Sequence, residues 1–287
     1  MNYKADYHIH TTYCDGKSTP SNIVKKAISK NINIIGFSGH SMNPFAETWH
    51  IAPNEHENYI NEINSLKEKY KNDIQILRGF EADYIPSLCE PSFNRFKNFF
   101  PEYLIGSVHY IVTKNGFFTI DDSVENVKEG IDKLFNGNGK KVVQEYFYLE
   151  REMIKNCDFT ILGHLDLVRK RNNILHFFNE DESWYKKELK ELVKEIKKTN
   201  LLIEINTGAI SRKIMNDVYP SSYMLELLHN ENIPIIFSSD SHTEETLCAH
   251  FDKAKEAAIK AGYKEHAILI PAKSNEAKAT IKMQPIL

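Results

Sequence analysis

The feature that most constrains this chain is a repeated alternation of short apolar runs with longer amphipathic segments. Seven runs rich in β-branched and aromatic residues are typical of strands, at 3–10, 32–40, 74–83, 103–110, 158–166, 201–208 and 233–242. Stretches with helical spacing separate most of them. Strands that alternate with helices pair in parallel through βα units. The pattern therefore predicts an α/β fold in which the seven strands close into a barrel.

Helix signals between the runs support this interpretation. Thr19 can cap a helix whose first turn holds Pro20, and Ser241 and Glu244 have the spacing of a capping box before a helix that follows the last run. The longest interval, 111–157, contains a hairpin-like stretch and two helical stretches, so we expect an insertion after the fourth strand. A chain of 287 residues, 41% of them hydrophobic, can form one large domain or two small ones, and seven βα units in this length favour a single domain over 1–287.

Charge and cysteine content exclude several classes of protein. The formal net charge of −3 offers no basic surplus for a phosphodiester backbone, so no nucleic-acid partner is expected. The four cysteines are scattered and form no CxxC pair, as in reduced proteins. No apolar run is long enough to span a membrane, and no signal peptide is visible. We expect a cytoplasmic protein without a membrane partner, and the sequence leaves the oligomeric state open.

Residues able to bind metal stand where the predicted strands end. They are His8 and His10, His40, Glu81, His109, His164, Asn206, and Asp240 with His242. The carboxyl ends of the strands of a parallel βα barrel form the face where active sites are built. We therefore expect these side chains to meet at one rim.

A single histidine at a strand end is more often a packed core residue than a metal ligand. So many of them at equivalent strand ends favour metal binding instead. His8 and His10 are two apart on a strand and point to the same side. Asp15 and Asp240 add negative charge, and Glu81 can bridge two ions with its two oxygens. So many nitrogen and oxygen ligands exceed the needs of one ion and suit Zn, Mn, Fe or Co alike. For the remaining histidines, at 50, 56, 176, 229, 250 and 266, we expect no metal role.

The order of these motifs resembles a known family. "HIH" followed by "CDG", a lone histidine after the second strand, "GFE", "GSVH", "GHLD" and a final "DSH" are similar to the PHP family, named for its polymerase and histidinol phosphatase members. The resemblance implies a distorted, TIM-like (β/α)7 barrel with three divalent metal ions. Within the family, "EINTGAISRK" followed by "YPS" most resembles the stand-alone L-histidinol-phosphate phosphatases.

The resemblance also implies a ligand set for each ion. His8, His10, Glu81 and Asp240 would hold the first ion, Glu81 with His109 and His164 the second, and Asp15, His40 and His242 the third. The family usually has an acid before the histidine that ends its second strand, and this chain has Gly39 there.

The implied reaction is hydrolysis of a small phosphate monoester, L-histidinol phosphate, in histidine biosynthesis. A hydroxide bridging two ions would attack phosphorus, with Glu81, Asp240 and His242 as catalytic residues. The proton donor to the leaving oxygen stays open between His242 and a water on a metal. Arg169 and Arg212 are candidates to bind the phosphate. The candidates for the histidinol part are Glu47, Trp49, Tyr84 and Glu90.

Two other functions remain as alternatives. A phosphodiesterase, exonuclease or other phosphoesterase of the same family would use the same metals on a different substrate. A non-catalytic module would use the metal centre for binding alone.

Overall fold

The computed structural model describes residues 3–41, 43, 48–272 and 278–287. Its strands are β1 (Ala5–Asp6), β2 (Ile34–Phe37), β3 (His40–Ser41), β4 (Gln75–Asp83), β5 (Tyr103–Ser107), β6 (Tyr110–Thr113), β7 (Gly116–Thr119), β8 (Ile161–Leu162), β9 (Leu202–Asn206), β10 (Ile235–Ser238), β11 (Glu265–Ile270) and β12 (Thr280–Pro285). Its α-helices are α1 (Pro20–Ser29), α2 (His56–Lys69), α3 (Val124–Phe135), α4 (Gly139–Asn156), α5 (Asn172–Leu175), α6 (Ser183–Ile196), α7 (Gly208–Ser211), α8 (Ser222–Asn230) and α9 (Phe251–Ala261).

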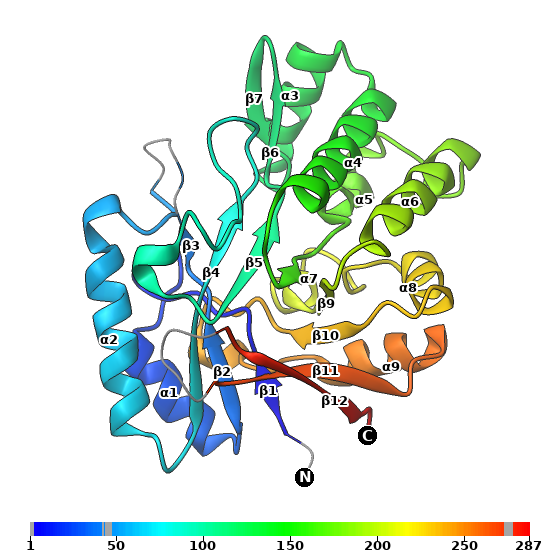
Figure 1. Ribbon diagram of the computed structural model, residues 1–287. Helices are drawn as coiled ribbons and strands as arrows, with labels where there is room; N and C mark the ends of the chain where they lie inside the picture. The colour runs from blue at the N-terminus through cyan, green and yellow to red at the C-terminus, as the bar shows by residue number, and fades with distance from the viewer. Residues whose placement is uncertain (1–2, 42, 44–47, 273–277) are drawn as a thin grey trace.

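One large sheet runs through the molecule in the order β1-β2-β4-β5-β8-β9-β10-β11-β12, and β3 also pairs with β4. All pairs are parallel except β11 with β12. Figure 1 shows helices α1 and α2 beside the first strands and α8 and α9 beside the last ones. The fold is therefore mixed α/β with a mostly parallel sheet, as the alternation of apolar runs predicted.

Each of the seven predicted runs contains one strand of this sheet, but the sheet has more strands than seven. Strand β3 is a short addition, and the β11–β12 hairpin extends the sheet after the last predicted run. An isolated parallel bridge joins Ile9, beyond β1, to Ser241, beyond β10. The backbone N–H of His10 donates to the carbonyl of Ser241, and that of Ser241 donates to the carbonyl of His8. These bonds bring the first and last predicted runs side by side.

The apolar strands bury both faces, as strands of a parallel sheet do. Ile34 belongs to an inner cluster with residues from β4, β5, β8, β9, β10 and β11, whereas its neighbour Ile35 packs in the larger outer cluster against the helices. Tyr103 fills the inner cluster, and a Cβ at Gly36 or Gly79 would come within 2.4 or 2.5 Å of its ring. Glycine on β2 and β4 therefore makes room for this tyrosine.

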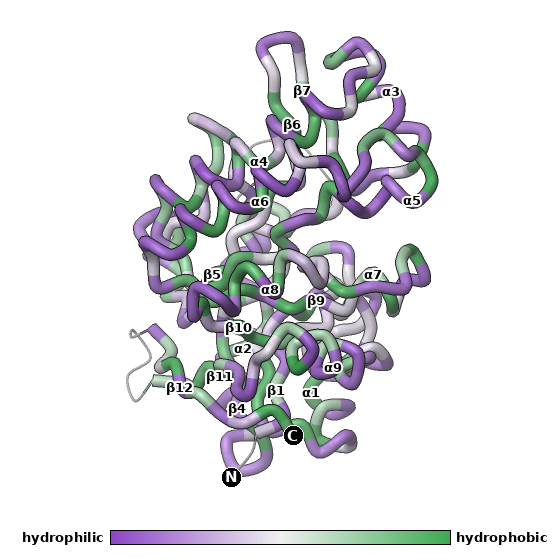
Figure 2. The backbone as a smooth tube through the Cα atoms, turned by 90° about the vertical axis from the view of Figure 1, so that its right-hand side faces the viewer, coloured by the Kyte–Doolittle hydropathy of each residue, from purple (hydrophilic) through white to green (hydrophobic). Residues whose placement is uncertain are grey.

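The helices cover the sheet with one apolar side. Along α4 and α6, hydrophilic and hydrophobic stretches alternate, as expected for helices with one buried face (Figure 2). Helix α1 begins as predicted, because the side chain of Thr19 accepts a hydrogen bond from the backbone of Asn22 and Pro20 occupies the first turn. Among the described residues, no helix is long and apolar enough to cross a membrane.

The predicted insertion contains the β6–β7 hairpin followed by α3 and α4. These elements stand together above the sheet in Figure 1, and α4 packs against α6. The hairpin ends at Thr119, so the chain that follows it returns toward the carboxyl ends of the strands.

The predicted helix start at Ser241 is wrong. Helix α9 begins at Phe251, and the intervening segment holds only a 3-10 turn, Glu244–Thr246. The backbone of Ser241 forms hydrogen bonds with the backbone of His8 and His10, just beyond β1. Its hydroxyl donates to the carbonyl of Thr243 at 2.7 Å. The capping-box spacing is therefore present without the helix, because tertiary pairing keeps Ser241 extended.

Candidate metal centre

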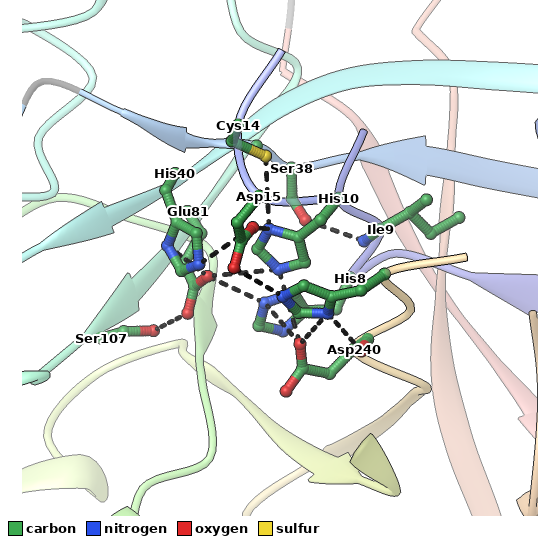
Figure 3. Close-up of polar contacts among 12 residues, drawn as sticks. His8, Ile9, His10, Cys14, Asp15, Ser38, His40, Glu81, Ser107 and Asp240 are labelled. Atoms are coloured by element: carbon green, nitrogen blue, oxygen red, sulfur yellow. Dashed lines mark hydrogen bonds and ion pairs between the residues drawn. The ribbon is translucent and has the colours of Figure 1, made fainter. Parts of the chain in front are cut away.

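Histidine and carboxylate side chains gather at the carboxyl ends of the parallel strands. The nine residues expected as metal ligands fall into overlapping groups whose ligand atoms lie within 4.8 Å of one another. They are His8, His10, Asp15, His40, Glu81, His109, His164, Asp240 and His242. Figure 3 shows six of them converging from separate segments of the chain.

Glu81 lies at the middle of the cluster, and its two oxygens face different partners. Oε2 lies 3.0 Å from Nε2 of His8 and 3.0 Å from Nδ1 of His40. Oε1 lies 3.0 Å from Nε2 of His164 and 3.6 Å from Nε2 of His109. Nε2 of His10 also lies 3.5 Å from Oε2. A carboxylate with a separate set of histidines at each oxygen has the arrangement needed to bridge two cations.

A second part of the cluster lies toward the surface. Nε2 of His242 is 3.1 Å from Oδ2 of Asp15, and Nδ1 of His10 is 3.6 Å from Oδ1 of the same residue. Nε2 of His10 lies 3.5 Å from Oδ1 of Asp240. The side chains of Asp15 and His242 are 32% and 23% exposed, whereas that of His10 is fully buried. Asp15 and His242 therefore form the accessible edge of the cluster.

Unsatisfied buried atoms test whether a metal fits here. Nε2 of His8, Nε2 of His10, Nδ1 of His40 and Oε2 of Glu81 are buried, and within the described ranges none of them has a hydrogen-bond partner. Each such atom costs on the order of 1–3 kcal/mol if left unpaired. All four face one another, so divalent cations between them would satisfy the whole set. Nitrogen and oxygen ligands of this kind suit Zn, Mn, Fe or Co.

Glu204 in β9 holds His8 in the required orientation, and the sequence analysis did not single it out. Its Oε1 accepts from Nδ1 of His8 at 2.6 Å, which leaves Nε2 free to face Glu81. Burial raises the pKa of Glu204, but His8 more than offsets this, so the carboxylate is ionised. A glutamate inside the buried apolar run "LLIEIN" was the available signal.

Asp83 does the same for His109. Its Oδ1 accepts from Nδ1 of His109 at 2.6 Å, and its Oδ2 lies 2.8 Å from Nε2 of His50. Burial raises the pKa of Asp83, but His109 and His50 lower it to about 2. Asp83 follows Glu81 by two positions in β4, and this same-face spacing could have indicated its role. The six histidines for which no metal role was expected are absent from the ligand groups found in the described residues.

Arg212 reaches the cluster from the end of α7. Its Nη2 donates to Oδ2 of Asp240 at 2.7 Å, and its Nη1 donates to the Asp240 carbonyl at 3.1 Å. Gly208 makes this possible, because a Cβ there would come within 2.7 Å of both Arg212 Nη2 and Asp240 Oδ2. The arginine therefore stands at the metal centre, as expected from its place after β9.

Arg169 does not join the cluster. It lies at the end of a 3-10 turn, Leu167–Arg169, and its guanidinium contacts three carboxylates and one carbonyl instead. Glu180 and Asp217 accept from it at 3.0 and 2.7 Å. The next residue, Lys170, lines the cavity at the metal centre instead, and its Nζ donates to Asp121. The side chain of Arg169 is thus committed to ion pairs within the fold.

A cavity of about 460 Å³ opens above the cluster. Besides the candidate ligands, the residues that line it are Trp49, Thr119, Asp121, Asp122, Leu167, Lys170 and Arg212. Of the candidates for the histidinol part, Trp49 therefore lies at the cavity, while Tyr84 and Glu90 do not line it. Glu47 falls outside the described residues.

The glycine before His40 leaves little space for a larger residue. A Cβ at Gly39 would meet Ile51 at 2.9 Å and the Cys14 sulfur at 3.3 Å. The imidazole of His40 is supported instead by Trp49, whose ring lies edge-on at 4.7 Å.

Comparisons with known proteins find similar sequences and similar folds. The chain is 27% identical over 259 residues to the histidinol-phosphatase of Bacillus subtilis, a match that covers 83% of this chain and 93% of that protein. The fold is similar to a solved structure from Listeria monocytogenes, with a TM-score of 0.77, 22% identity and coverage of 87% of this chain and 99% of that one.

A second solved structure, the histidinol phosphate phosphatase of Lactococcus lactis in complex with zinc, L-histidinol and phosphate, has a TM-score of 0.71 at 21% identity. The match covers 96% of this chain and 98% of that one. The family model for the PHP domain matches residues 6–208, which include all the candidate ligands except Asp240 and His242. The chain therefore belongs to the PHP domain family.

Proposed function

We propose that this protein is a metal-dependent phosphatase that hydrolyses L-histidinol phosphate to L-histidinol and inorganic phosphate. The observation that carries the proposal is Glu81, whose two oxygens each face their own set of histidines beneath a cavity that Arg212 also lines. The names of the Bacillus subtilis and Lactococcus lactis relatives support the choice of substrate.

Three divalent ions, Zn, Mn, Fe or Co, are the proposed cofactors. Three of the ligand groups support this number: His8, His10 and Glu81; Glu81, His109 and His164; and His10, Asp15, His40 and His242. Asp240 completes the first group, since its Oδ1 lies 3.5 Å from Nε2 of His10. When bound, the ions supply Lewis acidity and lower the pKa of water at the site.

The side chains around the ions bind and orient the substrate. Arg212 offers a planar fork of donors to two phosphate oxygens, and Lys170 adds a second positive charge at the same cavity. Glu81, Asp240 and His242 are catalytic in the sense that they hold the ions against the reacting phosphate. Arg169 has no part in this, because it does not line the cavity and three carboxylates engage its guanidinium, whereas Arg212 lines the cavity and pairs with one carboxylate, Asp240.

We further propose that residues 1–287 form one domain and that its sheet closes into a distorted barrel. The Ile9–Ser241 bridge and the inner apolar cluster, to which β1 and β10 both contribute, support closure. The segment 111–157 is then an insertion that adds a wall to the cavity.

The test is release of inorganic phosphate from L-histidinol phosphate by the purified protein with its metal content measured. An aryl phosphate, a nucleoside monophosphate and a phosphodiester are assayed beside it, and His10→Ala is the matched variant. We expect a strong preference for histidinol phosphate in the wild type. In His10→Ala, turnover falls by at least about 10³-fold together with bound metal, since a metal centre supplies most of the charge stabilisation. Faster turnover of the phosphodiester, or none with full metal occupancy, would refute the proposal.

A further inference from the structure

The cavity contains a carboxylate that the proposed reaction does not use. Asp121 follows the β6–β7 hairpin and lines the cavity opposite the strand ends. Its Oδ2 accepts from Nζ of Lys170 at 2.9 Å. Within the described part of the chain, no hydrogen bond engages its other oxygen.

The carboxylate is held firmly in place. Arg171 donates from Nη2 to the backbone carbonyl of Asp121 at 3.1 Å and from Nε to that of Asp122 at 2.5 Å. One residue earlier, the backbone of Ile120 donates to the carbonyl of His109 at 2.8 Å. Burial raises the pKa of Asp121, but Lys170 and His109 lower it below its usual value, so the group is anionic at neutral pH.

Its charge and position suit a cation on the substrate. The ammonium of Lys170 shows that this carboxylate binds an amine, and the oxygen without a hydrogen bond can accept from a second one. Arg212, on the same cavity, supplies the positive charge for a phosphate. An ester with a phosphate and an ammonium group on neighbouring carbons matches this pair of opposite charges.

We propose that Asp121 binds the ammonium group of the alcohol and thereby makes the site select phosphate esters of amino alcohols. The inference rests on the proposed phosphatase function. Asp121 is here a specificity-determining residue contributed by the insertion, distinct from the groups that hold the ions.

A competing role is that Asp121 only positions Lys170 for the phosphate. The two roles differ in their dependence on the amine. A positioning residue would affect every phosphate ester equally, whereas a residue that binds the amine would affect only substrates that carry one.

The experiment compares kcat/KM for L-histidinol phosphate and for its analogue with hydrogen in place of the amino group, in the wild type and in Asp121→Asn. A charged hydrogen bond contributes roughly 1.5–3 kcal/mol, which corresponds to about 10- to 100-fold. For histidinol phosphate, we expect kcat/KM of the variant to be lower than that of the wild type by this factor. For the analogue, we expect kcat/KM to change by less than about 3-fold. The control is Asp132→Asn on α3, because this carboxylate of the insertion pairs with Lys128 on the surface and does not line the cavity. This control variant should leave the ratio of kcat/KM between the two substrates unchanged.

Each outcome decides a different point. An equal loss with both substrates in Asp121→Asn overturns the inference in favour of the positioning role. If Asp121→Asn does not fold, the wild type alone decides, because equal kcat/KM for the two substrates contradicts amine binding. A wild type that does not hydrolyse histidinol phosphate at all refutes the proposed function itself.

Discussion

Glu204 contributes to the metal centre without facing the ions. Its two oxygens accept from Nδ1 of His8, from the backbone of His164 and from the side chain of Asn206, so it fixes two candidate ligands at once. The contact to His8 is 2.6 Å long and fully buried. Such partners set the tautomer of a histidine and so decide which nitrogen is left for a metal.

Glu204→Gln keeps the shape of this side chain and removes its charge. We expect metal affinity to fall about 10- to 100-fold, because the single oxygen of a glutamine amide cannot accept both from Nδ1 of His8 and from the donors of His164 and Asn206. Titration with a competing chelator, followed by metal analysis, measures the change. Glu195→Gln on the surface of α6 is the matched control, and equal affinities in the two variants would show that Glu204 does not orient the ligands.

The sequence predicted the nine candidate ligands because each stands at or beyond a strand end, where position alone brings them together. It assigned phosphate binding to Arg169 and not to Lys170, since only the 3-10 turn Leu167–Arg169 decides that Lys170 is the one that lines the cavity. Glu204 and Asp83 were missed for a related reason. Both lie inside buried strands, and only the pairing of β4 and β9 with their neighbours reveals which histidine each carboxylate meets.

The β11–β12 hairpin is the element that the sequence analysis left out, and it closes the lower part of the molecule in Figure 1. Gln284 on β12 links three segments. Its amide group exchanges two hydrogen bonds with the backbone of Tyr3 and donates to Nε2 of His266 at 3.0 Å. Nδ1 of His266 in turn donates to the carbonyl of Ala267. This network requires neutral His266, because the Gln284 donor occupies the nitrogen that a second proton would take.

We expect the hairpin to lose stability in mild acid. Burial lowers the pKa of His266 from 6.5 to about 4, against a smaller opposing effect of the Ala267 carbonyl. His266 therefore becomes protonated near pH 6.5 in the unfolded chain but only near pH 4 in the folded chain. Between these values the free energy of unfolding falls with falling pH by roughly 3 kcal/mol.

Denaturant unfolding of wild type and His266→Gln from pH 7 to pH 4 measures this contribution. Titrations elsewhere in the protein cancel in the difference between the two proteins. The free energy of unfolding of the wild type should exceed that of His266→Gln by less and less as the pH falls. A variant at an exposed histidine, His176→Asn, should show the same pH dependence as the wild type. A constant difference across this range would contradict the assignment to His266.

At the scale of the whole molecule, the candidate ligands are spread along the sheet, from its first strand, β1, to β10. They come from the ends of β1, β3, β4, β5, β8 and β10, and from the loop that carries Asp15. Bound ions would therefore act as cross-links of the entire sheet. A ligand that binds only the folded state stabilises it in proportion to its affinity and concentration.

Removing metal should accordingly lower the melting temperature. An ion present at about 1,000 times its dissociation constant contributes about 4 kcal/mol, which is on the order of 10 °C for a chain of this size. Calorimetry before and after chelation, and again after Zn or Mn is added back, measures this. The melting temperature of His10→Ala should fall far less when the chelator is added. Identical melting curves for the wild type with and without chelator would exclude a stabilising metal.

The bridge between Ile9 and Ser241 also determines when the metal centre can form during translation. The group of His8, His164 and Asp240 draws on residues from nearly opposite ends of the sequence. While the chain is still on the ribosome, the first histidines emerge long before the aspartate that completes their group. That part of the centre can form only when almost all of the protein has been translated, so an interrupted chain cannot assemble it.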